Sequence, residues 1–140
     1  MTPGLLDSRR LTGPNLFWDR PGAVLDVSTT DLPADVLIPA WTTEVSRLME
    51  AVGWTTQHIC TRVYQGGASL VINAPIDVLY AACELNEFAF KRAVANLSGE
   101  PQPDLQETID ELHRLINEES KPDLLALQAA AEQHQVPFLW

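Results

Sequence analysis

The chain has 140 residues, of which 46% are hydrophobic and 20% are charged, and its formal net charge at pH 7 is −10. This length suits one domain with its own core and is short for two. The negative charge argues against general binding to nucleic acid, and no apolar run is long enough to span a membrane. Because no signal peptide is recognisable at the N-terminus, we expect a cytoplasmic protein.

The chain opens with an unusual segment, DSRRLTGPNLFWDR, at residues 7–20. Its apolar residues and its Gly-Pro-Asn turn are consistent with a structural clamp. Alternatively, Arg9, Arg10 and Arg20 surround a rigid turn where Asn15 offers an amide. A guanidinium binds a carboxylate through two hydrogen bonds, so these residues are also candidates for a carboxylate-binding clasp. Residue chemistry alone leaves both interpretations open.

A strand and a helix are expected next. Alternating aliphatic residues predict a strand over residues 22–29. Residues 30–39, with Pro33 and Pro39, are expected to form a loop. From Ala40 onwards apolar residues recur at intervals of three and four, which predicts a helix that ends at Gly53.

A β-hairpin is predicted over residues 55–74, because two β-rich runs flank Gly66-Gly67. Glycines suit a tight turn, in which positive φ angles are common. The bare backbone amides of Gly66 and Gly67 are also candidates for holding an anionic group, and Arg62 lies close to them in the sequence. Both roles are kept, with the structural one favoured.

The second half of the chain is expected to be mostly helical. Helices are predicted over residues 75–97, 103–119 and 122–133, with a linker at residues 98–104 and an apolar strand, QVPFLW, at residues 135–140. We expect this last strand either to dock on the sheet or to lead into further chain.

The expected architecture is α+β, with a small mixed sheet that includes the hairpin, a long central helix packed on it, and a C-terminal helical pair. We divide the chain into an α+β domain at residues 1–98 and a helical segment at residues 99–140.

The sequence carries none of the common catalytic or phosphate-binding motifs. Glu84 and Glu87 share a helix face and are possible acid–base partners, but a solvated face is the favoured interpretation. Cys60 and Cys83 lack ligand spacing and are expected to be buried free thiols, and no metal site is predicted.

The motif LTGPN at residues 11–15, the Gly-Gly hairpin and the order strand, helix, hairpin, long helix resemble the N-terminal domain of cyanophycin synthetases and their Mur-ligase-like relatives. The tail at residues 124–140 resembles the segment that leads into an ATP-grasp domain. The helix after the hairpin reads LYAACELNEFAF and lacks the histidine of the family's Glu-His pair. This difference places the chain outside the best-known polymer-making branch.

The resemblance implies a non-catalytic domain that holds an amino-acid polymer or peptide product. ATP and Mg would be used by ATP-grasp and Mur-ligase-like domains beyond these residues, so no catalytic residue or cofactor is expected in this chain. Only Leu11 to Asn15 and Gly66-Gly67 match the family's motifs. The assignment of ligand binding to Arg9, Arg10, Arg20 and Arg62 rests on charge instead.

Two other functions remain open from the sequence. The domain is a possible structural or assembly module that packs on a partner chain or a missing domain, and a homo-oligomer is possible. It is also a possible small enzyme that uses Glu84 and Glu87, which requires both carboxylates to line a pocket.

Overall fold

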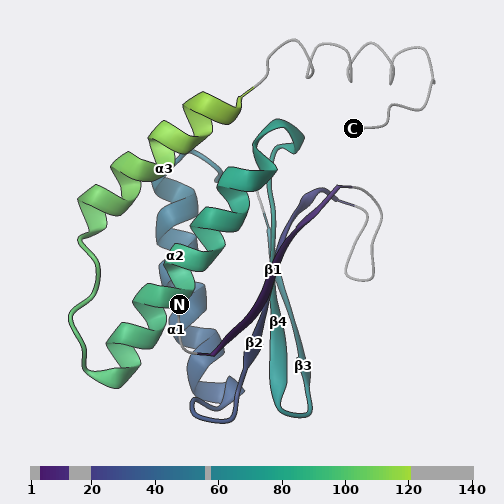
Figure 1. Ribbon diagram of the computed structural model, residues 1–140, viewed down its shortest axis with the longest axis vertical. Helices are drawn as coiled ribbons and strands as arrows, with labels where there is room; N and C mark the ends of the chain where they lie inside the picture. The colour runs from purple at the N-terminus through teal and green to yellow at the C-terminus, as the bar shows by residue number, and fades with distance from the viewer. Residues whose placement is uncertain (1–3, 13–19, 56–57, 121–140) are drawn as a thin grey trace.

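The computed structural model describes residues 4–12, 20–55 and 58–120 (Figure 1). Three expectations fall outside these residues: the Gly-Pro-Asn turn with Asn15, the helix at 122–133 and the strand at 135–140.

Four strands form one sheet in the order β1-β2-β4-β3. Their bounds are Leu5–Leu11 for β1, Gly22–Ser28 for β2, Ile59–Tyr64 for β3 and Gly67–Asn73 for β4. Every pair is antiparallel, so the described sheet is not the mixed sheet that we expected. The central strands β2 and β4 are almost wholly buried, which explains their runs of aliphatic residues.

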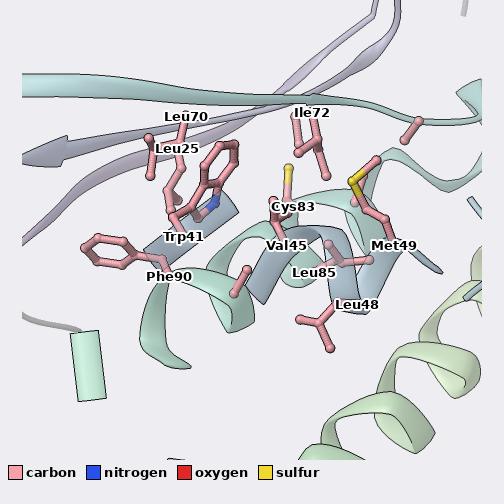
Figure 2. Close-up of a cluster of buried hydrophobic side chains, with 14 of the residues drawn as sticks. Leu25, Trp41, Val45, Leu48, Met49, Leu70, Ile72, Cys83, Leu85 and Phe90 are labelled. Carbon is pink, nitrogen blue, oxygen red and sulfur yellow. The ribbon is translucent and has the colours of Figure 1, made fainter. Parts of the chain in front are cut away.

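The helices cover one face of this sheet (Figure 1). They are α1 (Ala34–Ala51), α2 (Leu79–Ser98), which follows a short 3₁₀ turn at Ile76–Val78, and α3 (Leu105–Glu119). Side chains from β2 and β4 meet those of α1 and α2 in the main core, which Figure 2 shows around Leu25, Trp41, Val45, Leu70 and Phe90. The α+β class, the hairpin and the long central helix are thus confirmed.

Two elements differ from the sequence-based expectation. Strand β1 was not predicted, because Leu11 is its only buried residue and its polar residues give no apolar alternation. Helix α1 begins at Ala34, inside the segment expected to be a loop. Pro39 removes one backbone hydrogen bond near the start of this helix but does not end it.

A buried ion pair joins α1 to α2. Arg92 Nε donates a hydrogen bond to Glu44 Oε2 at 2.8 Å, and both side chains are almost completely buried. Arg92 also donates to the carbonyl of Pro103, and the Gln102 side chain donates to the carbonyl of Arg92 at 3.0 Å. The segment expected to be a linker is therefore held against the two helices.

Helix α3 packs on α2, and its Leu112 is fully buried in the same core as the sheet. Residues 105–119 thus share the core of residues 1–98, and the division at residue 98 stays a prediction. No helix in the described ranges is long and apolar enough to cross a membrane.

Candidate functional site

Strand β1 sends its two adjacent arginines to opposite faces of the sheet, because side chains alternate along a strand. Arg9 pairs in register with Val24 of β2, whose side chain lies on the face away from the helices. Arg10 pairs with Ala23, which belongs to the main core under the helices. The two side chains therefore leave the strand on opposite faces, although residues 8–10 all contribute to the rim of one pocket, and ligand binding by Arg9 or Arg10 stays a prediction.

Arg9 is engaged by two carboxylates on the outer face of the sheet. Its Nη1 donates to Asp26 at 2.5 Å and to Asp7 at 2.9 Å. The hydrogen bond to Asp26 is the main cause that raises the pKa of the Arg9 guanidinium. Burial opposes it, and the hydrogen bond to Asp7 raises the pKa further. Because Asp26 and Asp7 already bind this guanidinium, a carboxylate of a ligand would have to compete with them for Arg9.

Arg62 lies on the same outer face as Arg9. It pairs in register with Ser69 of β4, whose other neighbour in register is Asp26 of β2. Arg20 is exposed just before β2. The alternation along β1 therefore places Arg10 on the opposite face of the sheet from Arg9 and Arg62, and ligand binding by Arg20 and Arg62 stays a prediction.

The Gly66-Gly67 turn has a clear structural cause. Gly66 has a φ of +80°, which favours glycine. A Cβ atom on Gly67 would lie 2.8 Å from the carbonyl oxygen of Val27 and 2.5 Å from the Tyr64 ring. Both glycines are thus needed for the turn itself, and anion binding there stays a prediction.

Arg10 lines a pocket of about 820 Å³ between β1, α2 and α3. Its guanidinium carbon lies 4.1 Å from the centre of the Tyr80 ring, a cation–π contact that holds the arginine at the edge of the pocket. Acidic and polar side chains form the other walls, among them Ser8, Glu84, Glu87, Glu118 and Glu119. The pocket thus presents both signs of charge.

Two of these carboxylates are held by hydrogen bonds from the protein. The Ser8 hydroxyl donates to Glu87 at 3.1 Å. The Glu119 carboxylate accepts the backbone N–H groups of Tyr80 and Ala81 at 2.9 and 2.7 Å, at the N-terminus of α2, where a negative charge is favourable. Glu119 therefore fastens the end of α3 to the start of α2 and completes the pocket.

Burial and the charge of Glu87 raise the pKa of Glu84. Burial also raises the pKa of the neighbouring Cys83 thiol to about 11, so this cysteine is a poor nucleophile at neutral pH. Cys60 and Cys83 are both free, as expected, although Cys60 is only partly buried.

We expect Glu84→Gln to raise the melting temperature at neutral pH. A carboxyl group with a raised pKa binds protons more tightly in the folded state, so its ionisation destabilises the fold as pH rises. The stabilisation should fade as pH falls through the folded pKa of Glu84 toward its ordinary value of 4.5. Thermal unfolding at several pH values checks this, with Glu50→Gln as control, since Glu50 is an exposed residue of α1 outside the pocket. An equal response of both variants would contradict it.

The hypothesis of a small acid–base enzyme requires Glu84 and Glu87 to line a pocket. Both residues do line this one, while catalysis itself stays a prediction. Across the ranges 4–12, 20–55 and 58–120, no three His, Cys, Asp or Glu side chains gather as a metal site would need.

The chain matches no protein-family model and no curated protein.

Sequence reasoning did not predict this pocket. Ser8, Tyr80 and the α3 carboxylates come together only because β1 forms an edge strand beside α2 and because α3 folds back along α2 (Figure 1). The one signal available in the sequence was the alternation along Ser8, Arg9 and Arg10, which assigns Ser8 and Arg10 to the same face of an extended chain.

Proposed function

We propose that this domain is a non-catalytic binding module of an ATP-dependent, peptide-forming ligase that resembles cyanophycin synthetase. In this role it holds a peptide-like substrate or product near ATP-grasp and Mur-ligase-like domains. The motif at residues 11–15 and the glycine hairpin support the family, and the described element order agrees with the order on which the resemblance rests.

One observation carries the binding role: the pocket places Arg10 and the carboxylates of Glu84 and Glu87 around the same space. A peptide with acidic and basic groups offers a carboxylate for the guanidinium and a cation for the carboxylates. Such charge-assisted hydrogen bonds are the stronger kind, and Arg10 is already oriented by its contact with Tyr80. Arg10 is thus the sequence-predicted residue that we retain for ligand contact.

A short peptide with one glutamate and one lysine should bind the wild-type chain, and Arg10→Ala should weaken its affinity by about tenfold or more, since a hydrogen bond to a charged group contributes about 1.5–3 kcal/mol. Isothermal titration calorimetry at low ionic strength measures both affinities. Arg62→Ala is the matched control, because it removes an exposed arginine from the opposite face of the sheet.

If Arg10→Ala bound the peptide as tightly as the wild type, or if Arg62→Ala lost more affinity, the peptide would not bind at the pocket of Arg10.

A second measurement tests whether the chain is catalytic. The chain alone should turn over no ATP in the presence of amino acids, and turnover would contradict the non-catalytic role.

A further inference from the structure

The two edges of the sheet differ in how they are protected against pairing with another strand. Strand β1 carries an irregularity in register between Leu5 and Asp7, together with three charged side chains. Bulges and charges of this kind discourage pairing between sheet edges. Strand β3 pairs with β4 in continuous register over all six of its residues, contains no proline and carries a single charge, Arg62.

The described part of the chain pairs β3 on one side only, with β4. The N–H of Asn73 donates to the carbonyl of His58 at 3.0 Å. Because hydrogen-bonded pairs alternate along an antiparallel ladder, Cys60, Arg62 and Tyr64 direct their backbone groups toward β4. Ile59, Thr61 and Val63 then direct their N–H and C=O groups toward the other edge.

Two large apolar side chains are exposed on this strand. Val63 is 59% exposed and Tyr64 is 41% exposed. The acidic helix α3 lies on the far side of the molecule from β3 (Figure 1). The five acidic residues of α3 are therefore far from this edge, and the single charge on β3 itself is positive.

We propose that β3 is a dimerisation edge and that its partner is the β3 strand of a second copy of this chain. The two strands run antiparallel about a twofold axis at Thr61, which joins the sheets into one of eight strands. In this register Thr61 faces Thr61 of the second copy, and Val63 faces Ile59. The outward N–H and C=O groups of Ile59, Thr61 and Val63 would then all form hydrogen bonds with the second copy.

Charge repulsion favours the register with its axis at Thr61 over the register with its axis at Arg62. An axis at Arg62 would place the two Arg62 side chains directly opposite each other, and like charges in that position destabilise a strand pair. With the axis at Thr61, Arg62 faces Cys60 instead, and exposed Val63 gains an apolar neighbour. The interface is isologous and closes at two copies, as a twofold contact does.

Sedimentation equilibrium over a wide range of concentration tests the proposal. The wild-type chain should show a reversible dimer. Val63→Lys should weaken it by about tenfold or more, because the lysine adds a charge to the paired edge. Leu6→Lys is the matched control, since Leu6 is 63% exposed on the other edge strand, and its dimer should be unchanged. A monomeric wild type, including one whose own C-terminal segment covers β3, would overturn the proposal.

Disulfide trapping tests the register separately. In a Cys60→Ser background, Thr61→Cys should form an intermolecular disulfide under mild oxidation, because residues opposite each other in a strand pair lie within disulfide reach. The Arg62→Cys variant should form an intermolecular disulfide far more slowly, because residue 62 faces residue 60 of the second copy in this register. Trapping through Arg62→Cys alone, or equal trapping by both, would overturn the proposed pairing even if the chain dimerises.

Discussion

Arg92→Ala should lower the free energy of unfolding by about 3–5 kcal/mol, since removing one member of a buried ion pair leaves an uncompensated charge. The Glu44 carboxylate would lose its 2.8 Å partner in a place where it is almost fully buried. Arg47 lies 3.4 Å from the other oxygen of Glu44, but its side chain is half exposed and replaces little of this interaction. Chemical denaturation measures the loss.

Two further variants separate charge from packing. The double change Glu44→Met with Arg92→Met should recover much of the stability, because well-packed apolar residues often replace a buried ion pair at small cost. Arg114→Ala removes an exposed arginine with two ion pairs on α3 and should change stability little. If Arg92→Ala were as mild as Arg114→Ala, the buried pair would not fasten α1 to α2.

The second large effect is expected at Gly22, the first residue of β2. A Cβ atom there would lie 1.9 Å from the carbonyl oxygen of Ile72 and 2.8 Å from the Cα of Asn73. Both are backbone atoms of β4, so no side chain can turn aside to relieve the clash. Gly22→Ala should therefore cost more than about 3 kcal/mol, above the usual range for overpacking.

Gly53→Ala is the comparison for this prediction. A Cβ at Gly53 meets nothing within 4 Å, and its φ of +86° leaves only the strain of a left-handed backbone, about 1–2 kcal/mol. Guanidinium denaturation of the two variants shows which of them loses more free energy of unfolding. A Gly22→Ala variant at least as stable as Gly53→Ala would show that β4 leaves room for a side chain at Gly22 and would contradict the 1.9 Å approach.

The parts of the fold that the sequence predicted are those with strong periodicity. Strands β2 and β4 and the helices α2 and α3 bury apolar residues, and burial is what the pattern reports. Strand β3 is instead half-buried or exposed, and it was predicted from its β-rich composition and the Gly66-Gly67 turn that joins it to β4. Strand β1 carries no such pattern, because four of its seven residues, Asp7 to Arg10, are polar or charged. Its place in the sheet is decided by pairing with β2 rather than by its own apolar residues.

The candidate site was harder to predict for the same reason. The arginines attracted attention as a cluster in the sequence, but a strand separates neighbours onto opposite faces, so Arg9 pairs with Asp26 while Arg10 reaches Tyr80. The Glu119 carboxylate reaches the N-terminus of α2 from 38 residues away in the chain, a contact that no local pattern specifies.

Residue-resolved mapping tests the binding role most directly. The ¹⁵N-labelled chain is titrated with the peptide of one glutamate and one lysine while its amide resonances are followed. We expect the largest shifts at Ser8, Arg10, Tyr80 and Glu84 around the pocket, with Arg62 and Ser69 on the outer face unchanged. Shifts confined to the outer face of the sheet, or no shifts at saturating peptide, would contradict the proposed binding role of the pocket.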